Sequence, residues 1–447
     1  MFKTKLKLRW IIIAVLALIG VYYMYEQYRT IRLSPEEIIA NPSILNGAIM
    51  TGAVYKGLVL KDVTLTGTKF TKIILEKPVF ENVVFIDAKF DDMNMKNVQF
   101  KNVQFKDCTF ITAQISNGDF SEVSFKGGSF SYRGDINSRK RDYSSYIMGV
   151  GCDKVLFDAV AMNSVSMNGM EGSITFKNMH NIKKDDSSSV INGNKLTLRI
   201  DNCTADGFTF SAMFEGSTAY VTNSTFKNSA FVGENSKAMY FENCKILDGT
   251  EIHDAGTLVI KNSTVSGAFS GKGNWYFEGC EFVLDRSRAK LVDMVYEVSS
   301  TFEGDKDSHA FVLGSKTKAP WLSVRGGGAV DMYNMNIENF RLIDWASALE
   351  VNLRNVAIYG GDFGSESKYY KLKMKGGKWE NVQMYPEVNI NEHTDLGELK
   401  TYNLTFPNGN PWRGTGQVKT IPVKTPFDWP EIHVPTPTEM GLKDTLE

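Results

Sequence analysis

The chain has 447 residues, of which 43% are hydrophobic, 12% aromatic and 23% charged. This much apolar material can form a sizeable core, which excludes wholesale disorder. Fifty basic and 51 acidic residues leave a net charge of −1, so a general electrostatic attraction to nucleic acid or to an anionic membrane is not expected. Five cysteines in a chain of this length exclude a disulfide scaffold.

The chain begins with a basic head and an uncharged apolar run. Lys3, Lys5, Lys7 and Arg9 precede the run over residues 10–25, which is at the short limit for a membrane-spanning helix. No small-x-small cleavage motif follows the run, which favours an uncleaved transmembrane helix over the alternative of a cleaved signal peptide. The positive-inside rule then predicts a single-pass membrane protein with a cytoplasmic N-terminus and a periplasmic or extracellular body.

A strict five-residue period follows this segment. Every fifth position is apolar, and ten of these sixteen positions are phenylalanine. The positions are Tyr55, Leu60, Leu65, Phe70, Leu75, Phe80, Phe85, Phe90, Met95, Phe100, Phe105, Phe110, Ile115, Phe120, Phe125 and Phe130. Neither an α-helix nor a flat strand has this period, but a four-sided coil does if each side takes five residues and turns a corner. Asn, Asp and Gly, frequent three residues before the apolar position, suit such corners.

This stretch closely resembles the pentapeptide-repeat proteins, whose pattern is a small residue, any residue, and then Leu or Phe. A small or apolar residue lies two positions before each large one, as Val98 does before Phe100. The resemblance implies a four-sided β-helix in which both positions point inward. Stacked coils lie about 4.8 Å apart, so Phe80, Phe100 and Phe120 are expected in line, one coil apart. The family pattern is an interior pattern and therefore implies no catalytic residue.

After residue 150, strand-like runs recur with a corner residue in the middle, at spacings of 17 to 24 residues. The expected corners are Asn178, Asn202, Asn223, Asn243, Asn262 and Gly279, with similar units at Gly326, Asn355 and Gly376. Stacked asparagines would form a hydrogen-bonded ladder. This half resembles the right-handed parallel β-helices, the fold of pectin lyases and many phage tail spikes. The resemblance and the usual crossover preference imply an all-β, right-handed solenoid.

The remaining segments complete the predicted domain organisation. Ser34 begins a capping box with proline at the first helical position, which predicts a short helix over the open end of the stack. Seven of the twelve prolines lie between Pro407 and Pro437, so we expect an extended tail outside the coils. The predicted parts are a cytoplasmic tail and transmembrane anchor (1–30), a capping helix and linker (31–50), a pentapeptide-repeat β-helix (51–130), an interrupting loop (131–151), a parallel β-helix (152–400) and a proline-rich tail (401–447).

The cysteines and histidines give no support for a disulfide or a metal site. Cysteine and serine alternate at one position of successive coils, which predicts small interior side chains too far apart to cross-link. These residues are Cys203, Ser224, Cys244, Ser263 and Cys280. The sequence contains no CxxC or HExxH motif and no complete phosphate-binding loop. We therefore expect five free thiols, no metal and no cofactor.

The most concentrated charge in the body lies between residues 281 and 320. Polysaccharide lyases, hydrolases and epimerases with β-helix folds use acidic residues beside Arg, Lys or His for acid–base chemistry on uronic acids or glycosidic bonds. The candidates for such chemistry are Asp285, Arg286, Arg288, Asp293, Asp305, Asp307 and His309. The alternative interpretation is a solvated surface loop, and we expect these residues to lie on a loop.

Three classes of function are open. The first is a membrane-anchored, extracytoplasmic scaffold that binds another protein or an envelope polysaccharide without catalysis. The second is a polysaccharide-active enzyme. The third, known among pentapeptide-repeat proteins, is a DNA-mimicking topoisomerase modulator, which needs a cytosolic and strongly acidic surface that the anchor and the net charge oppose. The scaffold is favoured because every strong signal concerns architecture, and no nucleic-acid partner is expected.

Overall fold

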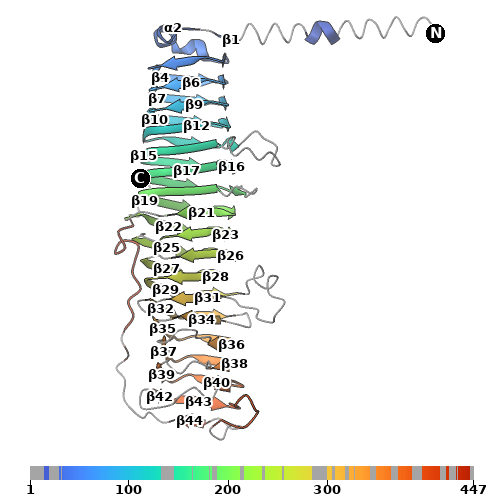
Figure 1. Cartoon of the computed structure of the whole chain (residues 1–447), viewed down its shortest axis with the longest axis vertical. Helices are drawn as coiled ribbons and strands as arrows, with labels where there is room; N and C mark the ends of the chain where they lie inside the picture. The colour runs from blue at the N-terminus through green and yellow to red at the C-terminus, as the bar shows by residue number, and fades with distance from the viewer. Residues whose placement is uncertain are drawn as a thin grey trace, which may run out of the picture. The chain divides into compact units, whose positions relative to one another are not determined.

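The computed structural model divides into two compact units, unit 1 (Met1–Ser166) and unit 2 (Met167–Glu447). Figure 1 shows the elements in chain order. Both units are parallel β-solenoids of the right-handed type, and helices among the described residues occur only before residue 46, which confirms the all-β prediction. The structure describes residues 15–19, 30–31, 33–131, 145–163, 165–180, 182–183, 189–211, 216–233, 237–253, 256–283, 300–304, 308–317, 322–326, 328–342, 349–363, 371–384, 395–412, 419–421, 429 and 431–442.

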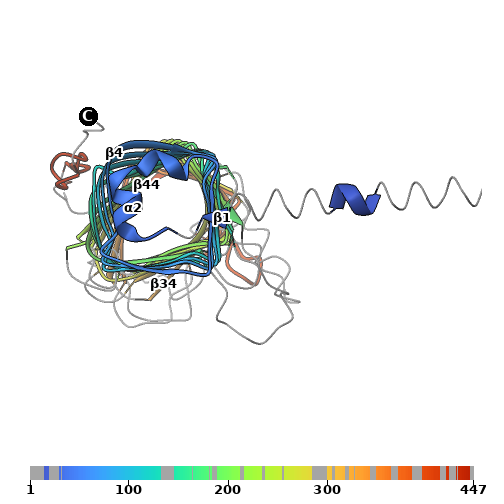
Figure 2. The ribbon, with the colours of Figure 1, turned by 90° about the horizontal axis from the view of Figure 1, so that it is seen from above.

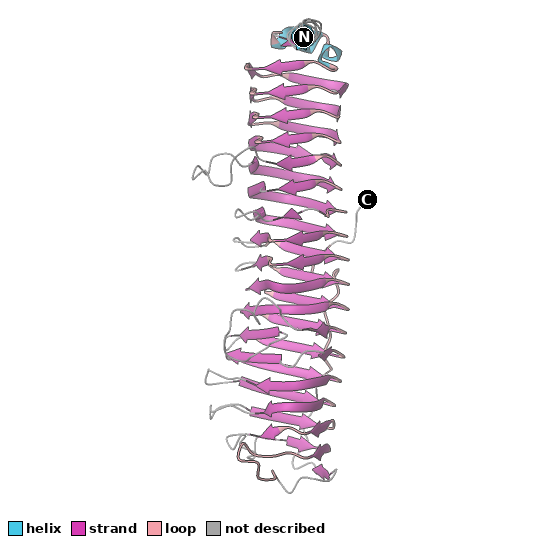
Figure 3. Cartoon of the chain, turned by 90° about the vertical axis from the view of Figure 1, so that its right-hand side faces the viewer, coloured by secondary structure: helices cyan, strands magenta, loops and turns pink. Residues whose placement is uncertain are grey.

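In unit 1, short strands form the sides of successive coils and pair in parallel with their counterparts one coil away (Figure 3). Val83 pairs with Val103 and Phe85 with Phe105, so one coil takes 20 residues. Seen along the stack, the coils have four sides (Figure 2). The strands are β1 (Thr30–Ile31), β2 (Ile49–Thr51), β3 (Val54–Lys56), β4 (Val59–Thr66), β5 (Lys69–Thr71), β6 (Ile74–Glu76), β7 (Val79–Ile86), β8 (Lys89–Asp91), β9 (Asn94–Lys96), β10 (Gln99–Lys106), β11 (Thr109–Ile111), β12 (Gln114–Ser121), β13 (Ser124–Lys126), β14 (Ser129–Ser131), β15 (Ser145–Asp158) and β16 (Ala161–Asn163).

The interior of unit 1 contains continuous rows of aromatic rings. All sixteen positions of the five-residue period are buried, which confirms the predicted register. Phe100 stacks on Phe80 with ring centroids 5.3 Å apart and lies 4.8 Å from Phe120 on its other side. Phe105, on the next side of the same coil, meets Phe100 edge-on at 5.6 Å. Such aromatic pairs contribute about 0.5–1.5 kcal/mol beyond their buried area, so the rings hold neighbouring coils and neighbouring sides together.

The corners of unit 1 have a left-handed backbone conformation. Asn82 and Asn102 have φ values of 55° and 50°, a region that asparagine and aspartate tolerate better than most residues. Asn102 Nδ2 donates to Asn82 Oδ1 at 3.0 Å, and Asn82 Nδ2 donates to Asp62 Oδ1 at 2.7 Å. The corner prediction is therefore confirmed. Lys72 and Thr112 have the same conformation, with φ values of 53° and 52°, and composition alone did not identify them as corners.

The coils resume earlier than the sequence predicted. β15 begins at Ser145 and pairs with β12, so residues 145–151 are strand and not part of an interrupting loop. Phe125 pairs with Phe157, 32 residues later rather than 20, so the five-residue register continues in phase after the inserted residues. The inserted residues shift all later inward positions along the sequence. Counting every fifth residue from Tyr55 therefore no longer reaches them, and the continuation was not predicted. Residues 132–144 lie outside the described part of the chain.

The predicted capping helix is present as α2 (Pro35–Ala40). Ser34 Oγ accepts a hydrogen bond from the Glu37 N–H at 3.3 Å, and the Glu37 carboxylate accepts one from the Ser34 N–H at 2.8 Å. The 3-10 helix η1 (Pro42–Leu45) follows, and Leu45 is fully buried next to β4. Figure 2 shows these turns lying over the first coil of unit 1, where they cover the open end of its apolar interior.

Unit 2 is built in the same way, with coils of variable length. Its parallel coils extend slightly beyond the predicted limit of residue 400, because β43 still pairs in parallel with β40, whereas β44 pairs with β43 in antiparallel orientation. Most of β17 (Val165–Lys177) belongs to this unit. The other strands are β18 (Ile182–Lys183), β19 (Ser189–Asp201), β20 (Thr204–Asp206), β21 (Phe208–Ser211), β22 (Thr218–Thr222), β23 (Thr225–Lys227), β24 (Ala230–Val232), β25 (Ala238–Glu242), β26 (Lys245–His253), β27 (Thr257–Lys261), β28 (Thr264–Gly271), β29 (Asn274–Glu278), β30 (Glu281–Phe282), β31 (Ser300–Gly304), β32 (His309–Leu313), β33 (Lys316–Thr317), β34 (Leu322–Gly326), β35 (Gly328–Tyr333), β36 (Asn336–Leu342), β37 (Leu349–Arg354), β38 (Ala357–Phe363), β39 (Lys371–Lys375), β40 (Lys378–Glu380), β41 (Gln383–Met384), β42 (Asp395–Gly397), β43 (Leu399–Tyr402) and β44 (Lys419–Ile421).

The asparagine ladder of unit 2 is confirmed in part. The six corners predicted from residue 178 to residue 279 all have left-handed backbone conformation. Asn202 Nδ2 donates to Asn178 Oδ1 at 2.7 Å, as a ladder requires. Asn223 Nδ2 instead donates to Asp201 Oδ1 at 2.9 Å. At this step of the ladder, Asp201 therefore replaces Asn202 as the hydrogen-bond acceptor.

One predicted corner is wrong. Gly326 lies within β34, where it pairs with Gly304, and is not a corner. The corners after Gly279 are Gly314 and Asn334, with φ values of 54° and 55°. Glycine suits both a corner and a strand in which backbones approach closely, so the glycine run near residue 326 did not distinguish the two.

All five cysteines are free, as predicted, and all five are buried. The Cys203 N–H donates to Ser224 Oγ and the Cys244 N–H donates to Ser263 Oγ, each at 3.0 Å. The alternating cysteine and serine side chains thus lie inside successive coils. Burial raises the pKa of the Cys244 and Cys280 thiols to about 12, which leaves little reactive thiolate at neutral pH.

The predicted membrane anchor lies mostly outside the described residues. Residues 15–19 are described and helical. In the described part of the chain, no helix has the length and apolar character that crossing a membrane requires. The anchor therefore stays a prediction.

Replacing Phe100 with alanine should lower the free energy of unfolding by about 3–5 kcal/mol, because the cavity would interrupt a stacked row. Denaturant unfolding followed by circular dichroism measures this change. Lys101→Ala is the matched control, since this side chain is 70% exposed and pairs with Glu81 on the surface, where an ion pair contributes about 0–1 kcal/mol. Equal losses in the two variants would contradict the assignment of inward and outward positions.

Candidate functional site

Of the seven residues proposed for acid–base chemistry, His309 alone lies within the described residues. It begins β32 and does not lie on the expected loop, because residues from His309 onward pair in register with β29 and β35. The remaining candidates, Asp285, Arg286, Arg288, Asp293, Asp305 and Asp307, lie outside the described residues. Their grouping around His309 therefore stays a prediction.

His309 forms a network with two residues that the sequence did not single out. His309 Nε2 hydrogen-bonds with Asp331 Oδ2, and the Tyr333 hydroxyl donates to Asp331 Oδ1 at 3.4 Å. Asp331 is only 4% exposed, so these two partners satisfy its carboxylate. Burial, and then the charge of Asp331, raise the pKa of Tyr333 to about 12. The residues come from adjacent coils, and only a known coil register would have brought them together.

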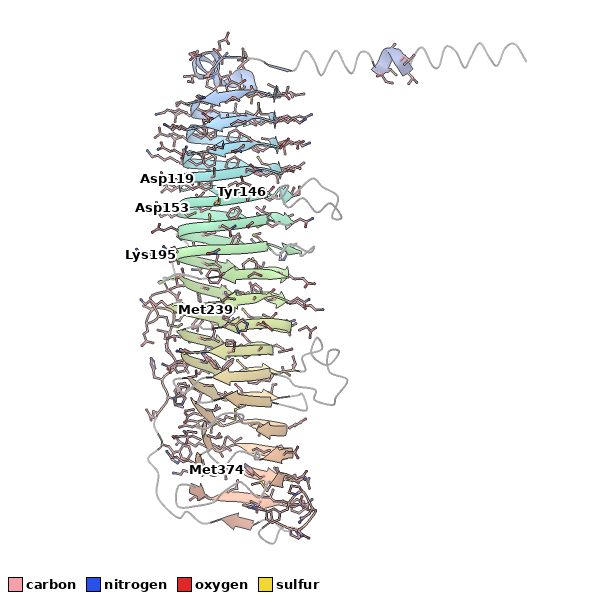
Figure 4. All side chains as sticks on the ribbon, in the orientation of Figure 1. Asp119, Tyr146, Asp153, Lys195, Met239 and Met374 are labelled. Carbon is pink, nitrogen blue, oxygen red and sulfur yellow. The ribbon has the colours of Figure 1, made fainter. Side chains whose placement is uncertain are left out.

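Beside His309 runs a row of outward-facing side chains that crosses successive coils of unit 2, which we call the outer row. Residues that alternate with it, such as Met239 (labelled in Figure 4) and Phe241, are fully buried inside the coils. The row changes from aromatic and apolar to polar along the chain. Its members, paired in register, are Tyr220, Tyr240, Val259, Tyr276, Phe311, Asp331, Asn352 and Lys373.

The polar end of the outer row contains an unsatisfied amide. Asn352 is 6% exposed, and its buried Oδ1 has no hydrogen-bond partner among the described residues. Its Nδ2 lies 3.4 Å from a Glu350 carboxylate oxygen, which also accepts from Lys373 Nζ at 3.0 Å. A buried acceptor without a donor costs roughly 1–3 kcal/mol. This end of the row can therefore accept a hydrogen bond from a ligand or a water molecule.

The C-terminal segment, residues 431–442, covers the apolar end of the outer row. Met440 and Leu442 pack in one cluster with Tyr220 and Tyr240, and all four side chains are buried. Figure 1 shows this segment beside β22 and β25. The tail thus lies outside the coils, as predicted, but it docks on unit 2. Proline content predicted that the tail lies outside the coils. Its docking depends on the outer row, which forms only when the coils stack, and so was not predicted.

A charged turn holds the docked segment in shape. The Glu439 N–H donates to Thr436 Oγ1 at 3.3 Å, and the Thr436 N–H donates to Glu439 Oε2 at 2.8 Å. His433 Nε2 lies 2.9 Å from the same carboxylate oxygen. The backbone N–H of Thr436, and then His433, lower the pKa of Glu439 to about 2. The ionised carboxylate thereby fixes the turn that places Met440 on the outer row.

A separate open groove of about 810 Å³ lies along the corners near the end of unit 2. We call it the corner groove. The residues that define it are Asn334, Asn336, Asn355, Gly376, Lys378 and Lys400. It crosses four successive coils, because Asn336 pairs with Ala357, Ala357 with Lys378, and Lys378 with Lys400. The groove therefore follows the direction in which the coils repeat.

The two sites differ in what they can do chemically. The network of His309, Asp331 and Tyr333 fixes the orientation of an imidazole, but it contains one carboxyl group, whereas glycosidic cleavage usually uses two. No group of His, Cys, Asp and Glu in the described ranges is arranged to hold a metal ion. The corner groove instead offers amides and ammonium groups at an open surface, which are groups for binding.

Comparison with protein families supports the repeat found in unit 1. The family model for the pentapeptide repeat region matches residues 45–132, and a sequence search among curated proteins finds no match. The solved structure of QnrB1, a plasmid-mediated fluoroquinolone resistance protein, is similar at 13% identity over 41% of this chain and 82% of that chain, with a TM-score of 0.24. The PL6 family alginate lyase AlyGC is similar at 8% identity over 84% and 88% of the two chains, with a TM-score of 0.16. Similarity this low gives no basis for transferring a function.

Glu439→Gln should loosen the docked C-terminal segment at neutral pH. A carboxylate with a lowered pKa stabilises the docked state above its ordinary pKa of 4.5, and this contribution is lost as the pH falls towards about 2. Amide hydrogen exchange over residues 436–442 should therefore be faster in the variant at pH 7. In the wild type it should accelerate, after correction for intrinsic rates, only below about pH 4.5.

Glu431→Gln, an exposed change in the same segment, is the control and should leave exchange unchanged. Unaltered protection in the Glu439→Gln variant would show that this carboxylate does not hold the turn.

Proposed function

We propose that this chain, in which residues 45–132 are a pentapeptide-repeat region, is a non-catalytic scaffold that binds another protein or an envelope polymer. The observation that carries this proposal is the division of side chains between the two sides of the coils. The repeating apolar positions fill the interior, while outward-facing aromatic and polar side chains pair in register from coil to coil, as they do along the outer row. Stacked repeats of this kind present extended, rigid surfaces to partners.

The outer surface of unit 1 illustrates such a row. Glu81 pairs with Lys61 on one side and Lys101 on the other, each at 2.9 Å and each one coil away. Hydrogen bonds from the two ammonium groups lower the pKa of Glu81 to about 2. Exposed ion pairs add little to stability. Their effect here is to keep alternating charges in fixed positions, which favours a partner with a complementary charge pattern.

We further propose that the scaffold is held at a membrane through residues 10–25, with the N-terminus in the cytoplasm and the body in the periplasm or outside the cell. The basic head, the uncharged run and the missing cleavage motif support this placement. A scaffold fixed at one end would present its outer rows to molecules of the envelope. The partner in this proposal is another protein or an envelope polysaccharide.

The chain should sediment with membranes until detergent is added, and protease added to spheroplasts should digest its body. Detergent-solubilised chain, purified through a tag, should retain a specific protein or polymer. A sham purification from cells without the tagged chain is the control. A body protected from external protease would contradict the proposed topology, and purification without any retained molecule would contradict the binding role.

Enzymatic turnover of a polysaccharide by this chain would overturn the non-catalytic proposal. The chain should cleave or epimerise no member of a panel of acidic polysaccharides. If the wild type shows robust turnover that His309→Ala abolishes and His253→Ala retains, the chain is an enzyme. His253 is the matched control because it lies in β26, where Glu251 and Ser270 are its partners, away from Asp331.

A further inference from the structure

The corner groove exists because a side-chain ladder stops. Asn355 Nδ2 donates to Asn334 Oδ1 at 3.0 Å, one coil back. The next corner is Gly376, whose φ of 65° resembles the 57° of Asn355, but it has no side chain to continue the ladder. A Cβ built on Gly376 would lie 3.8 Å from Asn355 Oδ1. Any polar side chain at this corner would therefore occupy the space of the groove.

The groove is lined with groups that match hydroxyls. The amides of Asn334, Asn336 and Asn355 border it, and each amide can both donate and accept hydrogen bonds. Met374, labelled in Figure 4, is 1% exposed and marks the interior of the coil that carries Gly376. The apolar core thus lies behind the groove, and the surface that a ligand meets combines these amides with apolar groups such as Ala357.

Two exposed tyrosines flank the groove at the spacing of two coils. Tyr359 pairs with Glu380, which pairs with Tyr402, so the tyrosines are about 9.6 Å apart along the stack. Their side chains are 40% and 37% exposed. Each lies two residues beyond a groove residue on the same face of its strand, as Tyr402 does beyond Lys400. Flat rings at an open surface suit the apolar faces of sugar rings, while their hydroxyls stay in water.

Positive charge exceeds negative charge around the groove. Lys378 and Lys400 line one side, and Arg354 and Lys375, paired in register, lie just before the corners on the other side. Glu398 also borders the groove. A further acidic group, on Glu380, lies 2.6 Å from the Lys378 ammonium.

Two of these cations are available to a ligand. Lys375 and Lys400 are exposed and have no acidic partner among the described residues. Ammonium groups of this kind bind carboxylates through charge-assisted hydrogen bonds.

We propose that the corner groove binds an acidic polysaccharide of the uronate type. The amides take sugar hydroxyls, Tyr359 and Tyr402 contact sugar rings along the stack, and Lys375 and Lys400 pair with carboxylates. This inference rests on the proposed binding role and names the ligand class for one surface. The groove runs along the axis on which the coils stack. The polymer therefore lies along the stack and contacts successive coils.

Gly376→Asn is the most direct test. Asparagine is tolerated at left-handed corners and would extend the ladder from Asn355, so the variant should fold with an unchanged or higher melting temperature. Its side chain would occupy the part of the groove next to Asn355. Titration of the full-length chain in detergent with oligogalacturonate, at fixed salt, should show binding that weakens by at least about tenfold in the variant.

Gly314→Asn is the matched control. This corner has a φ of 54°, has no atom within 4 Å of a built Cβ, and does not line the groove. The affinity of the Gly314→Asn variant for oligogalacturonate should stay within about twofold of wild type. Tyr402→Ala is a second variant and should also weaken binding, which keeps the proposal testable if Gly376→Asn fails to fold.

Two further ligands separate sugar recognition from simple charge attraction. A neutral galactose oligomer of the same length should bind weakly, because it lacks carboxylates, and polyglutamate should bind weakly, because it lacks sugar rings. Equal binding of polyglutamate, no binding of oligogalacturonate, or wild-type affinity in Gly376→Asn would each overturn the proposal. Retention of a protein partner by Gly376→Asn in membrane purification would leave the scaffold role standing, so the two proposals fail separately.

Discussion

Parallel hydrogen bonding between coils in register is the constraint on which the rest of the structure depends. Phe100 lies between Phe80 and Phe120 because β10 pairs with β7 and β12 without a shift. Once that pairing is fixed, every inward side chain meets a side chain from the coil before it and one from the coil after it. One large apolar residue at every fifth position then builds a continuous core. Each corner must adopt the same left-handed conformation so that the coils stay in register.

The same constraint organises the outside. Side chains that face outward also fall into rows, so a residue gains its neighbours from other coils rather than from adjacent sequence. Asp331 meets His309, and Tyr359 and Tyr402 share a face, for this reason. Rows of this kind supply binding surfaces without altering the interior. The C-terminal segment covers the apolar part of one row, whereas the corner groove of unit 2 is an open surface.

The interior of unit 1 was predictable from sequence because its period is short and its large residue is usually phenylalanine. The corner at Asn202 was predictable for a similar reason, since asparagine tolerates the left-handed conformation. Partners across coils were not predictable where insertions change the coil length: Tyr276 pairs with Phe311, 35 residues later, whereas Val259 pairs with Tyr276 after 17. The His309–Asp331 contact and the corner groove depend on those registers, so neither could be derived from motifs.

Deleting one whole coil from unit 1 tests the central claim most directly. Removal of residues 84–103 joins Val83 to Gln104 and preserves every inward position, because Val83 and Val103 occupy equivalent places in adjacent coils. Removal of residues 84–101 is nearly the same length but breaks the five-residue register. Cooperative thermal unfolding, measured by circular dichroism, should persist in the first variant with a modest fall in melting temperature and be lost or strongly weakened in the second. Equal tolerance of the two deletions, or equal collapse, would contradict a fold held by in-register stacking.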